Sequence, residues 1–262
     1  MSRLTGFFRS AGPLSLVFST TLFLLLSGPL AKAAPAHTVD LYLAEAPPLS
    51  MASQGDRHGI VGEVALRAAA LTGYQVNLIS LPWLRAQKEV QIGPDRLIVP
   101  LSRTPSRESD YTWIAPIMSM DRAFFTLDQR VETFEQAKKA YGLIAVGMGS
   151  AQEQKLRDEG FRDDQIYPLK IGDNPAQMLL RGRVDAWFNG VPESQYIWRQ
   201  LSDRPLKMSP PLMTAELYLA CSKSCDQAVV SSMGKAVEGL RMDGTIQRIA
   251  KDYLNGLAAP AQ

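Results

Sequence analysis

Histidine is scarce in this chain, because only His37 and His58 occur among its 262 residues. Neither lies beside a catalytic nucleophile or a metal-binding motif, and the patterns His-Glu-x-x-His and Gly-x-Ser-x-Gly are both absent. The segment Gly147-Met148-Gly149 is too short for a phosphate-binding loop and lacks its lysine. We therefore expect a protein that is not an enzyme and that needs no metal or other cofactor.

Cysteine is equally rare, since the only two, Cys221 and Cys225, lie four positions apart. Two ligands without a nearby histidine make a poor metal site. In an oxidising compartment we expect the two thiols to form one disulfide across a turn between a strand and a helix. So short a loop constrains little of the unfolded chain, and the entropy model gives a stabilisation of about 2 kcal/mol.

Long apolar runs are missing after residue 33, where no segment approaches the roughly 20 residues of a membrane span. Residues 14–30 are apolar, follow Arg3 and Arg9, and precede Ala31-Lys32-Ala33. This order is typical of a secretory signal peptide over residues 1–33, cleaved after Ala33, and predicts a soluble periplasmic product. An uncleaved anchor is the alternative, but serine and threonine interrupt the short run.

A strong excess of charge is also missing. Three of the 28 basic residues and none of the 26 acidic residues lie in the predicted signal peptide, which leaves 25 basic and 26 acidic residues and a net charge of −1. Nucleic acid and anionic membranes attract strongly basic surfaces. We therefore expect neither as a partner.

Strand-like and helix-like segments alternate along the remaining chain. Gly73 stops a helical apolar pattern, and Ser150 with Glu153 forms a capping box that predicts a helix start. We predict strands at 38–44, 75–81, 97–101, 123–127, 143–146, 184–188 and 216–221. We predict helices at 61–71, 83–92, from 150, at 174–182, at 192–201, and one long amphipathic helix over 229–253. The alternation favours an α/β fold with a mostly parallel sheet.

The segment 102–107, Ser-Arg-Thr-Pro-Ser-Arg, directly follows the predicted strand 97–101. A guanidinium group binds a carboxylate through two parallel hydrogen bonds, and hydroxyl groups can complete the shell around its oxygens. The segment is therefore a candidate site for a small carboxylate. The alternative is that Arg107 only forms a surface ion pair with Glu108 or Asp110.

Further motifs are spread over the whole remaining chain. They are Pro47-Pro48, Gly62, Trp83, Gly93, the block 102–107, Pro116, and the segments 146–150, 182–186 and 243–246. Their order and spacing resemble the family 3 periplasmic solute-binding proteins, the polar amino-acid type that serves ABC transporters. The resemblance implies an α/β type II periplasmic binding fold, with two lobes joined by two hinge strands.

The same resemblance implies the lobe boundaries. Lobe one would comprise residues 34–118 with 217–262, and lobe two would comprise residues 119–216. The chain would cross between them near 117–121 and 212–216. The ligand would lie in the cleft of a monomer, and closure of the lobes would trap it.

The resemblance also assigns ligand-binding residues. Arg107 matches the arginine that binds the ligand's α-carboxylate, Ser102 matches a hydroxyl residue at the same carboxylate, and Thr104 belongs to the same block. Gly149 and Ser150 match a turn whose backbone N–H groups meet that carboxylate from lobe two. Ser150 also fits an ordinary helix cap.

Gly190 stands where the family has an aspartate for the ligand's ammonium group. Glu193 is a candidate substitute, and its alternative is a simple acid at a helix N-terminus. An amino acid and a carboxylate without an α-amine therefore both stay open as ligands. Glu45 matches a side-chain-selecting position, with a solvated loop acid as its alternative. Trp83 either stacks on the ligand or belongs to the core.

The predicted function is that of a periplasmic solute-binding protein that delivers a small carboxylate-bearing ligand to the membrane permease of an ABC transporter. A sensor acting on a membrane receptor is one alternative. Another is an enzyme on the same fold, as cyclohexadienyl dehydratase is, with Glu193 or Glu45 as general acid.

Overall fold

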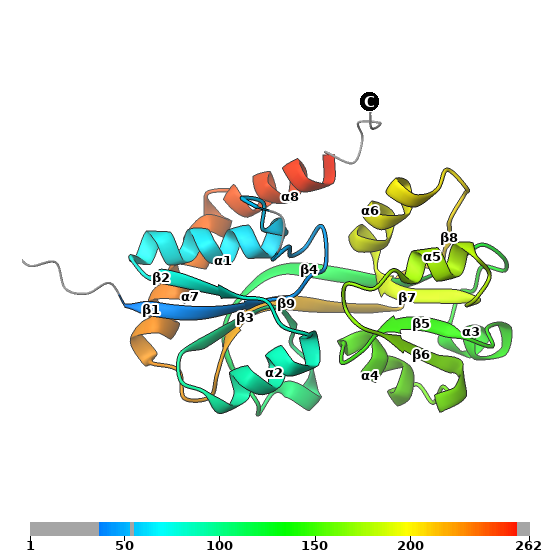
Figure 1. The fold of residues 1–262 in the computed structure, drawn as a ribbon, viewed down its shortest axis with the longest axis horizontal. Coiled ribbons are helices and arrows are strands. Elements are labelled where there is room, and N and C mark those ends of the chain that lie inside the picture. The colour runs from blue at the N-terminus through cyan, green and yellow to red at the C-terminus, as the bar shows by residue number, and fades with distance from the viewer. Residues whose placement is uncertain (1–36, 53–54, 256–262) are drawn as a thin grey trace, which may run out of the picture. The chain divides into compact units, whose positions relative to one another are not determined.

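The computed structural model describes residues 37–52 and 55–255, so the predicted signal peptide lies outside the described residues. Within this part of the chain no helix is long and apolar enough to cross a membrane. The strands form one sheet in the order β2-β1-β3-β9-β4-β7-β5-β6, with β8 paired to β4. Figure 1 shows this order from one end of the sheet to the other.

One end of the sheet carries the elements that we call the first half. They are β1 (Thr38–Leu43), α1 (Gly59–Thr72), β2 (Gln75–Ile79), α2 (Trp83–Ile92), β3 (Arg96–Ser102), the 3-10 turn η1 (Pro105–Arg107), α7 (Gln227–Met242) and α8 (Thr245–Asn255). Leu41 and Leu43 of β1 pack with α1, whereas Tyr42 packs with α2. Because side chains alternate along a strand, α1 and α2 cover opposite faces of the sheet (Figure 1).

The other end carries the second half. It comprises α3 (Phe134–Ala140), β5 (Ile144–Gly147), α4 (Ala151–Asp158), η2 (Asp163–Gln165), β6 (Ile166–Leu169), α5 (Pro175–Leu180), β7 (Ala186–Gly190), α6 (Val191–Leu201) and β8 (Lys207–Met208). Its buried apolar side chains form two clusters of their own, which contain Phe188 and Trp187 of β7 respectively. Each half therefore has a separate core.

Two long strands run through both halves. β4 (Thr112–Thr126) and β9 (Met213–Cys221) pair antiparallel, and the register matches Met118 with Leu217 and Asp121 with Thr214. The crossings predicted at 117–121 and 212–216 therefore lie opposite one another. The expectation of a mostly parallel sheet is correct within β1–β3 and within β5–β7, but wrong at the centre, where β9 and β4 are antiparallel to their neighbours.

The carboxy-terminal helix differs from its prediction. Instead of one helix over 229–253, α7 ends at Met242 and α8 begins at Thr245. Gly244 between them has φ +77°, a left-handed conformation that interrupts the helix and that glycine adopts without strain. The apolar positions of both helices still face the same core, which is why their spacing suggested one helix.

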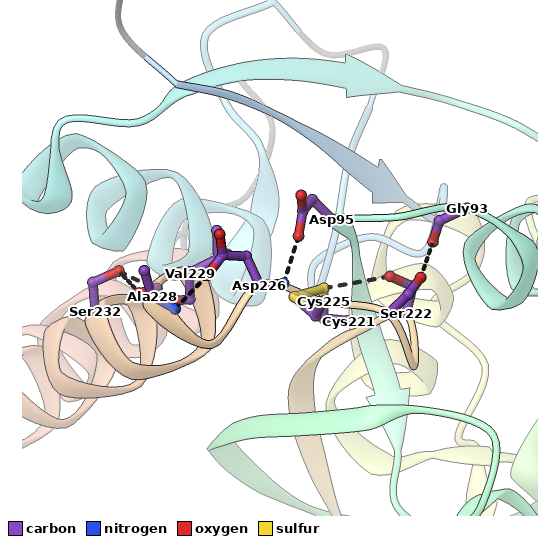
Figure 2. Close-up of a disulfide and its surroundings, with 10 residues drawn as sticks. Gly93, Asp95, Cys221, Ser222, Cys225, Asp226, Ala228, Val229 and Ser232 are labelled. Atoms are coloured by element: carbon purple, nitrogen blue, oxygen red, sulfur yellow. Dashed lines mark hydrogen bonds between the residues drawn. A yellow bond between two sulfur atoms is a disulfide. The ribbon is translucent and has the colours of Figure 1, made fainter. Parts of the chain in front are cut away.

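The predicted disulfide is present. Cys221 at the end of β9 bonds Cys225 just before α7, as Figure 2 shows. Asp226 follows and caps α7, since its Oδ1 accepts from the Ala228 N–H at 2.7 Å. The Asp226 N–H donates to Oδ1 of Asp95 at 2.6 Å. The disulfide and these two bonds fix the start of α7 against the edge of the first half.

Candidate functional site

A pocket of about 60 Å³ lies where the two halves meet. We call it the central pocket. Its polar lining comes from the first half through Ser102 and Arg107, from β4 through Arg122, and from the second half through Ser150, Gln152 and Glu193. Trp83 at the start of α2 adds an apolar wall.

The end of β3 and the turn η1 position Arg107. Its guanidinium donates from Nη1 to the backbone oxygen of Ser102 at 3.2 Å and from Nη2 to the backbone oxygen of Gly149 at 2.8 Å. Glu108 pairs with Arg103 instead, so the surface ion pair considered for Arg107 does not form with Glu108. Burial lowers the pKa of the Arg107 guanidinium, which increases the benefit of a bound anion.

Arg122 is the residue that the sequence analysis missed. It lies on β4 and is only 2% exposed, although it carries a charge. Nη2 donates to the Ser102 hydroxyl at 2.7 Å and Nη1 donates to the backbone oxygen of Met120 at 3.0 Å, whereas Nε has no partner within the described residues. Burial lowers its pKa to about 10, against the attraction of Glu193.

The contact with Arg122 also orients the hydroxyl group of Ser102. Because the Ser102 oxygen accepts from Arg122, its own hydrogen is directed elsewhere. Both residues line the central pocket, so this hydrogen is available to an acceptor there. The sequence places Arg122 between the predicted crossing 117–121 and the predicted strand 123–127, but this position alone does not show that its side chain is buried in the pocket.

Glu193 lies in the first turn of α6, and its carboxyl lines the central pocket. Within the described residues it makes no hydrogen bond or ion pair through that carboxyl. Burial raises its pKa to about 7, and the positive charge of Arg122 opposes the rise. Glu193 is therefore poised to change charge near neutral pH.

The turn before α4 differs from the expected cradle of free N–H groups. The Ser150 hydroxyl accepts from the Glu153 N–H at 3.1 Å, as a helix cap does. The Gly149 N–H donates to Oε2 of Glu153 at 2.7 Å, and the Ser150 N–H donates to the backbone oxygen of Gly147 at 3.2 Å. In this structure both backbone donors are already used, and Gly149 presents its carbonyl to Arg107.

The remaining predicted residues lie around the central pocket. Thr104 precedes η1, and its hydroxyl bonds that of Ser106 at 3.1 Å. It borders a neighbouring pocket beside Gly149 rather than the central one. Glu45 borders two other adjacent pockets, and its Oε2 accepts from the Ala52 N–H at 3.0 Å. The structure therefore brings Ser102, Arg107, Trp83, Ser150 and Glu193 together and places the other three predicted residues next to them.

The profile of the bacterial extracellular solute-binding proteins, family 3, matches residues 41–256. The chain belongs to this family. This confirms the predicted fold class, the α/β fold of the periplasmic solute-binding proteins. No curated protein sequence matches the chain.

Several solved structures share the fold of this family 3 protein, although their sequence identity to it is low. ArtJ, the arginine-, lysine-, histidine-binding protein of Geobacillus stearothermophilus, is 15% identical with a TM-score of 0.70 over 85% of this chain and 100% of that chain. A histidine kinase sensor domain with similarity to periplasmic binding proteins is 15% identical with a TM-score of 0.74, over 84% and 96%. An ancestral amino acid-binding protein, a precursor of cyclohexadienyl dehydratase, is 18% identical with a TM-score of 0.71, over 83% and 95%. These likenesses establish the fold alone.

Proposed function

We propose that this chain is a periplasmic binding protein that captures a small carboxylate-bearing ligand and delivers it to the membrane permease of an ABC transporter. One observation carries the proposal. Arg107, Arg122 and the hydroxyl group of Ser102 converge on one pocket, whose opposite wall consists of residues of the other half. Membership of the family supports the same function.

The charges explain why the ligand is an anion. A buried guanidinium is stable only when its charge and its N–H groups are compensated. Among the residues that the structure describes, Arg107 bonds two neutral backbone oxygens, and Arg122 bonds a backbone oxygen and a hydroxyl group. A bound carboxylate brings a negative charge to the two guanidinium groups and accepts from Ser102, so anion binding offsets the cost of burying these positive charges.

The proposed capture uses the two halves as lobes. Residues 34–118 with 217–262 move relative to residues 119–216 by bending β4 and β9, whose predicted crossings pair with each other. Arg107 contributes to closure because it spans the pocket to Gly149. A monomer suffices for this mechanism, because both walls of the pocket come from one chain.

The test is a thermal-stability screen of the purified chain with amino acids and organic acids. A ligand at 100 times its dissociation constant stabilises the wild type by about 2.7 kcal/mol. Arg107→Ala is expected to abolish this stabilisation. Arg103→Ala is the matched control, since Arg103 lies in the same loop, pairs with Glu108 and does not line the central pocket. Full binding by Arg107→Ala, or equal losses in both variants, contradicts the proposal.

A sensor role is a second candidate, and the likeness to a histidine kinase sensor domain favours it. In that case the liganded protein acts on a membrane receptor. Uptake of the radiolabelled best hit by cells with and without the gene separates the two roles. Loss of uptake supports transport, whereas normal uptake with a lost response to the ligand supports sensing.

A dehydratase is a third candidate, because one similar structure is a precursor of cyclohexadienyl dehydratase and Glu193 is a carboxyl with a raised pKa. Incubation with prephenate or arogenate tests it. Binding without loss of water and carbon dioxide supports the binding function. Turnover that Glu193→Gln removes supports the enzyme.

A further inference from the structure

The carboxyl of Glu193 lies where a side chain at position 190 would begin. A Cβ atom built on Gly190 lies only 2.3 Å from Oε2 of Glu193 and 3.0 Å from the sulfur of Met120. Any side chain at position 190 therefore collides with the carboxyl of Glu193 in its present position. The absence of a side chain at 190 is what gives that carboxyl its place in the pocket.

Arg122 approaches the same place from the neighbouring strand. The register pairs Arg122 of β4 with Gly190 of β7, so the two residues lie side by side across the sheet. Arg122 and Glu193 attract each other electrostatically, but the described residues show no direct ion pair between them. The pocket thus contains its own cation at the position next to the carboxyl of Glu193.

An ammonium group on the ligand is poorly suited to this arrangement. It would lie near the positive charge of Arg122, and like charges in a partly buried pocket repel each other strongly. It would also need Glu193 to be ionised, although burial favours the protonated form. A neutral oxygen has neither problem. It accepts a hydrogen bond from Arg122, and it either accepts one from protonated Glu193 or, as a hydroxyl group, donates one to that carboxyl.

We propose, on the basis of the binding function above, that Arg122 and Glu193 together recognise an uncharged oxygen next to the ligand's carboxylate, so the pocket prefers a 2-hydroxy or 2-oxo acid to the corresponding amino acid. Ser102 links the two parts of this site. Its hydroxyl group accepts from Arg122, and its hydrogen is free for the carboxylate. The atom bonded to the carboxylate therefore lies against Arg122.

The proposal has a pH dependence that separates the ligand classes. A 2-oxo acid has no hydrogen to donate, so its oxygen needs the protonated form of Glu193. Its affinity is expected to fall as the pH rises through about 7, the value to which burial raises the pKa of Glu193. A 2-hydroxy acid donates to the ionised form of Glu193, so it binds both below and above pH 7.

Other charged residues also line the central pocket or the adjacent pocket that Glu193 borders. They are Arg107, Arg122, Glu45, Lys170 and Asp173.

The experiment is calorimetric titration with matched probes that share a side chain. They are glutamate, 2-hydroxyglutarate and 2-oxoglutarate; leucine, 2-hydroxyisocaproate and 2-oxoisocaproate; and phenylalanine, phenyllactate and phenylpyruvate. The oxygen acids of the preferred side chain are expected to bind at least about tenfold more tightly than the amino acid. Measurements about one pH unit below and above 7 test the linkage.

Two variants locate the effect. Glu193→Gln keeps a group that donates to the oxygen, so it is expected to bind the 2-oxo acid as wild type does below pH 7 and to lose the pH dependence. Gly190→Asp combined with Glu193→Ala moves the carboxylate to position 190 and removes the side-chain end with which it would collide, and it is expected to gain amino-acid affinity. Glu135→Gln is the control, because Glu135 is exposed on α3.

Each outcome decides the matter. Preference for the amino acid, with loss of that binding in Glu193→Gln, overturns the proposal and leaves the binding function intact. The same follows if none of the nine probes binds but another compound in the stability screen does. If no compound binds at all, the binding function itself fails. Preference for the oxygen acids with retained binding in Glu193→Gln supports both.

Discussion

Glu193 lies in the first turn of α6, and its carboxyl lines the central pocket, where burial raises its pKa from 4.5 to about 7. Below pH 4.5 the group is protonated in both the folded and the unfolded chain, so the stability associated with it is fully present. As the pH rises toward 7, only the unfolded chain loses its proton. The free energy of unfolding therefore falls over this window, by at most about 3 kcal/mol.

Glu193→Gln is expected to remove this pH dependence. The variant should match the wild type near pH 4 and exceed its stability above pH 7, because the amide stays uncharged. Urea denaturation at both pH values measures the difference. Glu135→Gln, which changes an exposed acid, should follow the wild-type curve. Identical pH profiles for wild type and Glu193→Gln would show that the carboxyl is not perturbed.

Gly149 allows a second residue-scale prediction. Its φ is +70°, and an added Cβ would lie 2.3 Å from Cδ2 of Leu84 in the first half. Gly160 has φ +80° but no atom within 4 Å of an added Cβ. Both Gly→Ala variants are expected to lower the free energy of unfolding by about 1 kcal/mol through backbone strain.

Only Gly149→Ala is expected to weaken ligand binding as well, because only its methyl group collides with the opposite half when the pocket closes. Thermal unfolding without ligand compares the strain, and titration with the best hit of the screen compares the affinity. Leu84→Ala combined with Gly149→Ala should recover part of the affinity. Equal affinity in Gly149→Ala and Gly160→Ala would mean that Leu84 does not contact Gly149 in the liganded state.

Site residues could be predicted where the residues next to them in the sequence already indicate a binding segment. Ser102 and Arg107 follow an apolar strand within one short segment, so their proximity required no tertiary information. Arg122 lies between Asp121 and the apolar run Ala123-Phe124-Phe125, and nothing local shows that its side chain is buried. Its role depends on the pairing of β4 with β7 and β9, which one sequence does not display.

At the scale of the elements, prediction succeeded where periodicity and stop signals agree. The helix predicted over 83–92 is α2 itself, and Gly73 caps α1 in a left-handed conformation as expected. β4 was only partly predicted, because its first ten residues mix exposed and buried positions with no clean alternation. The short β6 and α3 were not predicted, because their few residues bury too small an apolar pattern to stand out.

The disulfide gives a prediction for the junction of β9 and α7. Replacement of both Cys221 and Cys225 by serine is expected to lower the free energy of unfolding by about 2 kcal/mol, because the unfolded chain loses a short closed loop. Urea denaturation measures it, and the variant should no longer respond to a reducing agent. Asp226→Ala in the same turn removes the helix cap, lowers stability by about 1 kcal/mol, and stays sensitive to reduction.

At the scale of the whole molecule, each half buries its own apolar clusters, and two long strands run through both halves. Most buried apolar area therefore stabilises each half by itself. The contacts across the pocket include the hydrogen bonds of Arg107 and Gln87 to Gly149 and the apolar side chain of Ile171, which packs against the first half. Such a division permits the halves to separate without loss of either core. The balance between open and closed forms then depends on individual contacts across the pocket.

Gln87 provides such a contact. Its Nε2 donates to the backbone oxygen of Gly149 at 3.1 Å, so it joins α2 to the second half without lining the central pocket. Gln87→Ala is expected to leave the stability of the free protein unchanged and to release bound ligand about fivefold faster, since one neutral hydrogen bond that holds the closed form is lost. Stopped-flow dissociation measures the rate.

Gln91→Ala is the control, because Gln91 lies one turn further along α2 and bonds Tyr111 within the first half. Equal rates in the two variants would mean that the contact with Gly149 does not hold the pocket closed, and that ligand contacts alone do so.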